Sequence, residues 1–552
     1  MHHRLDLIFG KMNNAKLKKM IASFPLKSSL MALLILLFSV NPGWARQASE
    51  GIEQVSFSIP KTLYFTGEKI WLEAKVEMQD RVSPSQVLYA ELVDANSNSM
   101  DYVKIPLQKG KALNYFSIHS KIPSGNYLLR VYTRISPYLN LEAGIAQQLI
   151  TIINPTVPPA PQSAIGDQRP SLPQEAFQAK KSSPIPDSAI GWDRSASSFG
   201  ISIANPFLPE EQKQLSSSLI YQPIESQMLL PELFGHIVEV RVPNSLAEST
   251  YFLSVHGSQS ALFTDIPDQE GRLLFDIGGL KHWDRMIIQL ENGEEMPGIE
   301  VVPPLIKTRF KEGFSIPPLV LKEGDLPYLE KLLKASIVEA NYQTQFIDDS
   351  LKVVTGFVAD YTYRLDDYTR FEEVETVLRE YVPSVFVRTE QRKKVFRLLD
   401  NPGNKVFESN PLILVDAMPV FDSDLLAQFN PKYFSKLEVL NREFFLNERT
   451  YAGVLSFSSY QNDLGLFPLA NNARFFDYFG LQPLIGLDKG QFSKPAENRR
   501  YPDWRTVLYW SSSSPLPASI AAPDWEGLFL IWKKIPANDG TERVERTYFR
   551  VN

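Results

Sequence analysis

Apolar and polar residues alternate in short runs between residues 53 and 154, and turn-forming residues separate the runs. A period of two directs one face of each run inward and the other toward water, which predicts the strands of a two-sheet sandwich. Thr66-Gly67 and Ser124-Gly125-Asn126 suit tight connections between such strands. The alternating runs are residues 55–59, 69–76, 87–93 and 127–132.

Residues 199–304 contain a second set of strand-like runs, at residues 237–242, 251–255 and 286–290. We therefore expect a second β-sandwich in this region. The segment before it, residues 155–198, is rich in Pro, Ser, Ala and Gln and has no apolar period. It is expected to be a linker that buries too little surface to order itself.

Helical spacing appears at residues 325–346 and again at residues 370–381. In the second segment, Thr369 and Glu372 have the spacing of a capping box, and Pro383 ends the pattern. We expect a helix in each segment. The apolar stripe of the first helix consists of Leu329, Leu332, Leu333, Ile337 and Ala340.

The N-terminal residues 1–45 have the order of a secretory signal peptide. Four lysines between residues 16 and 27 precede an apolar run at residues 30–40, and a turn and the small residue Ala45 follow. An uncleaved membrane anchor is the alternative. The run is shorter than the roughly 20 residues that cross a bilayer as a helix, which favours cleavage near Ala45. No later segment has membrane-spanning length.

Three segments of the first alternating region resemble macroglobulin-like β-sandwich domains. They are residues 64–71 (YFTGEKIW), 87–92 (VLYAEL) and 122–133 (IPSGNYLLRVYT), in the order found in that family. The resemblance implies a binding or spacer module. The covalent trapping chemistry of larger macroglobulins needs a thioester Cys, and this chain has no Cys.

A second resemblance concerns residues 410–420 (NPLILVDAMPV), 425–441 (LLAQFNPKYFSKLEVLN) and 451–460 (YAGVLSFSSY). These three segments resemble the plug domain of TonB-dependent outer-membrane receptors. The chain departs from that pattern at Ala417, where the family usually has Gly, and at the bulky residues 444–446. Too few residues follow Gln461 for a large transporter barrel. The resemblance therefore implies an orphan plug-like domain, as in bacterial envelope proteins that combine it with macroglobulin-like domains.

These patterns predict a mainly β, multi-domain chain in which Ig-like or macroglobulin-like sandwiches precede an α+β plug-like domain. The expected segments are a signal peptide (1–45), a macroglobulin-like sandwich (53–154), a Pro/Ser-rich linker (155–198), a second sandwich (199–304), a connecting segment with a helix (305–366), the plug-like domain (367–461) and a C-terminal β-unit (462–552).

Composition narrows the possible functions. A chain of 552 residues with 44% hydrophobic residues can bury several cores. Its net charge of −6 argues against a nucleic-acid-binding protein, which would carry a basic face. The absence of Cys excludes disulfides, a Cys nucleophile, Cys-ligated zinc, iron–sulfur clusters and a lipid-modified N-terminal Cys.

Motifs for catalysis are missing from the sequence. His2 and His3 lie within the expected signal peptide, the other four histidines fall singly, and neither a G-x-S-x-G elbow, a P-loop nor a dinucleotide-binding turn occurs. His256 stands near Ser258, where packing at a strand end is favoured over a catalytic base. Adjacent acidic residues such as Asp348-Asp349 and Asp366-Asp367 suit solvated turns. We predict no catalytic residues, no cofactor and no metal.

Five residues are possible partner contacts. Asp416 ends an apolar strand, where it is either a turn-forming residue or a binding contact at the exposed end of the plug-like domain. Arg388, Arg392, Lys393 and Lys394 belong to the strongest basic run of the chain. That run is either a solvated face or a contact for an acidic partner or an anionic lipid surface.

We therefore expect an exported, non-enzymatic scaffold or binding protein of a Gram-negative cell envelope, in the periplasm or at the outer membrane. Its expected partners are envelope or outer-membrane proteins. One alternative is an accessory of TonB-dependent transport, in which the orphan plug engages a separate barrel or the energy transducer. Another is a hydrolase of envelope polymers, which would need two carboxylates facing each other across a cleft.

Overall fold

The described elements are mostly strands in several small sheets, so the prediction of a mainly β, multi-domain chain is confirmed. The predicted signal peptide and the acidic pair Asp348-Asp349 lie outside the described residues. The computed structural model describes residues 51–79, 81–157, 175–190, 196–208, 215–225, 228–243, 249–291, 296, 298–340, 345–347, 356–447, 449–487, 502–511, 520–536 and 542–552.

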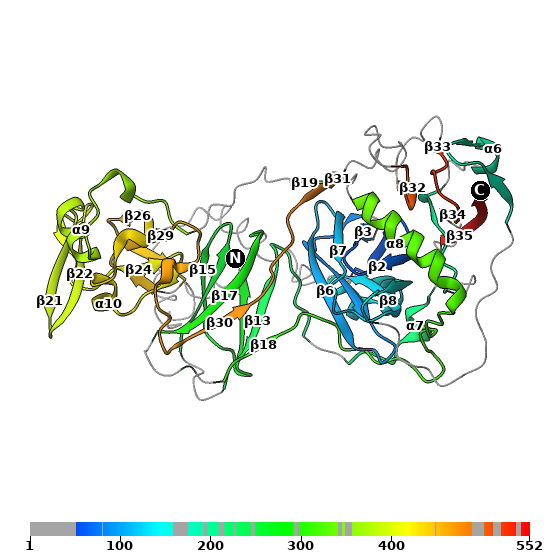
Figure 1. Ribbon diagram of the computed structural model, residues 1–552. Coiled ribbons are helices and arrows are strands. Elements are labelled where there is room, and N and C mark those ends of the chain that lie inside the picture. Colours follow the sequence, from blue (N-terminus) through cyan, green and yellow to red (C-terminus); the bar gives the residue numbers. More distant parts are fainter. Residues whose placement is uncertain are drawn as a thin grey trace, which may run out of the picture. The chain divides into compact units, whose positions relative to one another are not determined.

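The first sandwich consists of two sheets that enclose one apolar core (Figure 1). One sheet contains β1 (Glu53–Ser58), β3 (Lys69–Met78), β4 (Arg81–Val82) and β7 (Lys111–Ser117). The other has the order β2 (Leu63–Phe65), β9 (Ala146–Ile153), β8 (Gly125–Tyr132), β5 (Val87–Val93) and β6 (Ser99–Pro106). The four alternating runs all fall in or overlap these strands, as predicted.

A second group of strands joins parts of the chain that are far apart in sequence. Helix α8 (Leu326–Ala340) packs Leu329, Leu332 and Ala335 into the core of this five-stranded sheet. The sheet has the order β10 (Phe177–Ala179), β35 (Glu542–Val551), β34 (Gly527–Pro536), β12 (Ser198–Ile203) and β32 (Val507–Ser511).

This sheet corrects two expectations. The segment expected to be a linker contains β10, β11 (Pro184–Ile185) and α6 (Asp187–Ile190), and β12 does not belong to the second sandwich. All residues of β12 are buried, and the strand lies between β34 and β32. Small or polar residues alternate with apolar ones along this strand (SFGISI), but a local period does not reveal which distant strands it pairs with. Residues 158–174 of the expected linker lie outside the described residues.

The second sandwich has a three-stranded and a four-stranded sheet. The first sheet has the order β16 (Arg272–Asp276), β13 (Ile237–Arg241) and β18 (Glu300–Val302). The second has the order β15 (Ala261–Asp265), β14 (Tyr251–Gly257), β17 (Trp283–Leu290) and β30 (Ala473–Asp477). Because β30 pairs with β17, part of the segment expected to be a separate C-terminal unit completes this sandwich.

Residues 357–466, called the α+β module below, fold around a mixed five-stranded sheet (Figure 1). Its strands are β20 (Tyr361–Arg364), β26 (Phe434–Leu440), β29 (Val454–Ser459), β24 (Leu412–Val415) and β25 (Met418–Pro419), in that order. Strands β24 and β29 are parallel and the other pairs antiparallel. The same core includes side chains of α9 (Val374–Tyr381), α10 (Ser423–Ala427) and the strands β21 (Val385–Glu390) and β22 (Lys393–Asp400).

Helix α9 is shorter than expected. It begins at Val374 and has no side-chain cap. The guanidinium of Arg370, expected to be the first helical residue, instead donates a hydrogen bond of 2.8 Å to the carbonyl of Pro431. Because the helix begins at Val374, the capping box predicted from Thr369 and Glu372 does not form.

The remaining described elements are short. No helix among the described residues is long and apolar enough to span a bilayer. The short elements are α4 (Ser136–Leu139), α5 (Leu141–Gly144), α7 (Ser217–Ile220), β19 (Gln345–Ile347), β23 (Lys405–Val406), β27 (Phe444–Leu446), β28 (Arg449–Tyr451), β31 (Ile485–Leu487), β33 (Ile520–Ala521) and the 3-10 helices Glu323–Asp325, Leu365–Asp367, Pro431–Tyr433 and Leu464–Leu466.

Candidate functional site

Strands β21 and β22 form a hairpin that carries four of the five predicted contact residues. The turn residues Gln391 and Arg392 have φ angles of 49° and 67°. Two successive left-handed residues form the type I′ turn that matches the twist of a two-residue hairpin. Glu390 and Lys393 pair directly across this turn. The turn thus fixes the register of the hairpin.

The basic residues of the hairpin have two different roles. Arg388, Arg392 and Lys393 are exposed, and none of them has an ion pair with another described residue. Lys394 is half-buried, and its ammonium lies 2.8 Å from the carboxylate of Glu375 on α9. Lys394 therefore holds the hairpin against the helix, while the other three cations are free to meet an anionic partner.

Asp416 and Ala417 form a second type I′ turn, between β24 and β25, with φ angles of 47° and 67°. The Asp416 side chain is only 3% exposed. Its carboxylate accepts hydrogen bonds from the N–H and hydroxyl of Ser459 (2.7 and 2.5 Å) and from the N–H of Leu464 (2.8 Å). Burial raises the pKa of this carboxyl, and the hydrogen bonds oppose part of the rise.

The expectation that Asp416 makes an exposed partner contact is therefore wrong. The alternative drawn from the sequence, a turn-forming residue, describes its geometry. Its carboxylate ties the turn to the end of β29 and to the following loop. Ala417 adopts a left-handed conformation that costs an L-residue roughly 1–2 kcal/mol. The departure from the Gly of the plug pattern is thus a strained position.

We expect Asp416→Ala to lower the free energy of unfolding by about 2–4 kcal/mol, because buried donors of Ser459 and Leu464 lose their acceptor. Ala417→Gly, the matched change in the same turn, should raise it by roughly 0.5–1 kcal/mol by removing the left-handed strain. Urea unfolding followed by circular dichroism measures both. Equal midpoints for Asp416→Ala and the unaltered chain would contradict the structural role of Asp416.

A buried charged network lies between the two sandwiches, and no sequence pattern pointed to it. Glu232 is 2% exposed and accepts hydrogen bonds from the hydroxyl of Tyr89 on β5 (2.8 Å) and the N–H of Ile237 on β13 (2.9 Å). It also lies 2.9 Å from Nδ1 of His236, and Arg134 is 3.8 Å away. One carboxylate thereby joins both sandwiches.

Burial favours the neutral form of the two bases in this network. Burial lowers the pKa of His236 to about 4, although Glu232 opposes part of the shift. Burial likewise lowers the pKa of Lys104 on β6 to about 7. Nε2 of His236 lies 2.7 Å from the hydroxyl of Tyr478. A carboxylate beside a neutral imidazole could exchange protons with a substrate, but both side chains are buried, so the network serves packing between the sandwiches.

His256, weighed above as a catalytic base, lies inside the second sandwich. It is 2% exposed, and its Nε2 is 3.0 Å from the hydroxyl of Ser254 on the same strand. Burial lowers its pKa to about 4. This placement matches strand packing. Among the described residues, no group of three or more His, Cys, Asp or Glu side chains could hold a metal ion.

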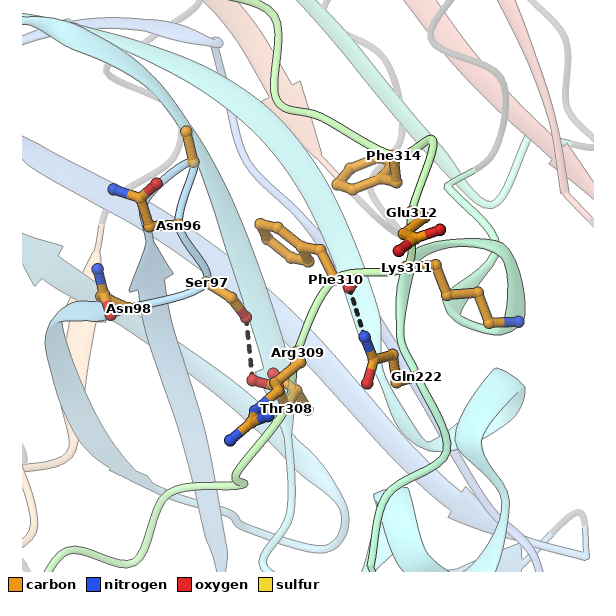
Figure 2. A pocket seen from close by; sticks show the side chains of 11 residues that line it. Asn96, Ser97, Asn98, Gln222, Thr308, Arg309, Phe310, Lys311, Glu312 and Phe314 are labelled. Carbon is orange, nitrogen blue, oxygen red and sulfur yellow. Dashed lines mark hydrogen bonds between the residues drawn. The ribbon is translucent and has the colours of Figure 1, made fainter.

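A shallow hollow of about 570 Å³ borders the β5–β6 turn (Figure 2). The hydroxyl of Ser97 donates to the carbonyl of Thr308 (3.1 Å), and the amide of Gln222 donates to the carbonyl of Phe310 (3.1 Å). The lining has one carboxylate, Glu312, and no histidine. The hollow therefore offers hydrogen bonding and aromatic contact, and it lacks the two facing carboxylates that a glycoside hydrolase requires.

Comparisons with known proteins leave the family open. No protein-family model matches the chain, and no curated protein matches it significantly. A CARDB domain from Pyrococcus furiosus is 12% identical and covers 19% of this chain and 94% of its own, with a TM-score of 0.15. Salmonella alpha-2-macroglobulin is 10% identical and covers 90% of this chain, with a TM-score of 0.16.

A β-glucosidase from Listeria innocua is 16% identical and covers 18% of this chain, with a TM-score of 0.14. The chain spans only 23% of the macroglobulin and 16% of the glucosidase. At such TM-scores the similarities identify neither a family nor an activity. We therefore take the exposed hairpin of the α+β module as the candidate functional site.

Proposed function

We propose that this chain is an exported, non-enzymatic scaffold of the cell envelope that binds another envelope protein through its α+β module. The observation that carries the proposal is the β21–β22 hairpin with three exposed cations, Arg388, Arg392 and Lys393, that have no ion pair within the described chain. The Lys394–Glu375 pair holds the hairpin on α9. A site ordered before binding loses less entropy when a partner docks.

We also infer that the α+β module is an orphan plug-like domain and that the first sandwich is macroglobulin-like. The three plug-like segments support the first inference, since they supply β24 and β25, then α10 and β26, and then β29, which are neighbours in one module. Export is supported by the order of charge, apolar run and small residue in residues 1–45.

The triple reversal Arg388→Glu, Arg392→Glu and Lys393→Glu should abolish partner binding, because it replaces three exposed cations with anions and leaves Lys394 in place. The measurement is affinity purification of the full chain from cross-linked, detergent-solubilised envelopes. We expect an envelope protein to co-purify with the unaltered chain and to be lost with the triple variant.

The matched control is Lys109→Glu, Lys111→Glu and Lys121→Glu, three exposed cations outside the α+β module. This control should retain the partner. If no envelope protein co-purifies with the unaltered chain, or if both triple variants behave alike, binding through the hairpin is excluded.

A further inference from the structure

The two strands of the β21–β22 hairpin differ in whether the backbone groups on their outer edges have hydrogen-bond partners. The N–H of Leu399 donates to the carbonyl of Ser384, which fixes the hydrogen-bonding phase of the ladder. In an antiparallel pair, residues alternate between facing the partner strand and facing away. Val387 and Thr389 therefore direct their N–H and C=O groups away from β22.

The outer edge of β22 is closed by side chains. The N–H of Lys394 donates to Oδ1 of Asp424 (2.9 Å), and the N–H of Phe396 donates to Oδ1 of Asn410 (2.9 Å). The hydroxyl of Ser423 donates to the carbonyl of Lys394 (2.7 Å). Both outward N–H groups of β22 next to the turn are thus satisfied within the module.

The outer edge of β21 is open. Within the described chain, the N–H and C=O groups of Val387 and Thr389 have no hydrogen-bond partner. Folded proteins usually cover such edges, since a free edge is a template for another strand. The fold covers the outer edge of β22 and leaves that of β21 uncovered. An extended segment can therefore pair with β21.

The side chains around the open edge define the chemistry of that segment. Phe386 and Arg388 project from the same face of β21, and Lys393 projects from that face of β22. Phe386 is 38% exposed, and both cations are exposed and without an ion pair in the described chain. A strand added beside β21 would place alternate side chains next to Phe386 and Arg388.

We propose that β21 accepts an extended acidic segment of a protein partner as an added strand. The inference rests on the proposed function and specifies its binding mode. Val387 and Thr389 each supply one N–H and one C=O to the incoming backbone. Carboxylates of the segment face Arg388 on β21 itself, and an apolar side chain covers Phe386. An anionic lipid surface would use the same cations but has no backbone for the open edge.

The decisive variant is Thr389→Pro, which removes an outward N–H and leaves the ladder to β22 unchanged. Its matched control is Thr389→Val, which keeps the N–H. The probe is a displayed pool of ten-residue peptides with Glu or Asp at alternate positions and Val, Ile, Thr or Tyr between them. Peptides selected on the full chain are then measured by fluorescence anisotropy. Thermal melting verifies that each variant is folded.

We expect the pool to yield binders whose affinity falls at least tenfold with Thr389→Pro and with Arg388→Glu, and less than twofold with Thr389→Val. The proposal is overturned if the pool yields no binder or if Thr389→Pro binds as well as the unaltered chain. It is also overturned if phosphatidylglycerol vesicles bind the unaltered chain and Thr389→Pro equally while peptides do not.

Envelope purification separates this inference from the proposed function. Should Thr389→Pro retain the envelope partner that the triple charge reversal loses, strand addition is excluded and the proposed function stands. Should the triple reversal also retain the partner, the proposed function itself is excluded.

Discussion

Glu232→Ala should lower the free energy of unfolding by about 3–5 kcal/mol, the range measured when one partner of a buried ion pair is removed. The carboxylate of Glu232 accepts from Tyr89, Ile237 and His236, and it faces the guanidinium of Arg134. Truncation removes the carboxylate that Tyr89, Ile237 and His236 share, although Arg134 keeps its ion pair with Glu239, and it removes a link between the two sandwiches.

Urea unfolding of the full chain measures this loss, and hydrogen exchange of the β13 amides shows where it acts. Glu312→Ala is the matched control, because Glu312 is exposed, and it should change stability by no more than about 0.5 kcal/mol. If the two variants unfold at the same urea concentration, the network does not hold the sandwiches together.

Acidification from pH 7 to pH 5 should cost on the order of 4 kcal/mol through two buried histidines. The pKa values of His236 and His256 are about 4 in the fold, and that of an unfolded histidine is about 6.5. Below pH 6.5 the unfolded chain binds more protons than the folded chain. The stabilisation that these two neutral histidines provide is therefore fully present above pH 6.5, and it is lost as the pH falls toward 4.

His256→Phe removes one of the two titrating groups, so it should roughly halve the loss between pH 7 and pH 5. His119→Gln serves as the control, since the His119 side chain is 70% exposed. Urea unfolding midpoints at pH 7 and pH 5 give the loss of stability for each variant. A loss that is the same in His256→Phe as in the unaltered chain would rule out His256 as a source of acid sensitivity.

Alternation along the chain located strands of the first sandwich, although β5 is buried on both faces and lacks the wet face that a period of two predicts. It succeeded for β3, where Ile70, Leu72, Ala74 and Val76 are buried at every second position. It did not reveal the partners of β12, which pairs with strands about 300 residues later. Pairing across such distances depends on packing that no local period encodes.

Helix α8 shows the same limit at the scale of single residues. The expected stripe included Ile337, which is 60% exposed, whereas Glu339 is buried. Glu339 accepts hydrogen bonds from the hydroxyl and N–H of Thr506 and lies 3.9 Å from the ammonium of Lys61. A hydrophobic stripe cannot anticipate a buried carboxylate whose partners come from two other strand regions.

The candidate site was predictable in part. The basic run predicted a solvated face, and Arg388, Arg392 and Lys393 are exposed, because such clusters rarely lie inside a core. The sequence could not distinguish Lys394, whose role depends on Glu375, or Asp416, whose donors lie more than 40 residues later. It also could not show that one edge of the hairpin is open, since that follows from the register of β21 and β22.

Site-specific photocrosslinking in intact cells tests most directly whether the hairpin holds an envelope partner. Phe386 is exposed on β21, so a photoreactive phenylalanine, p-benzoylphenylalanine, can replace it in the full chain with little change in shape. We predict one discrete adduct with an envelope protein, lost when Arg388, Arg392 and Lys393 are changed to Glu. No protein adduct, or an adduct that survives the charge reversal, would contradict the proposed function.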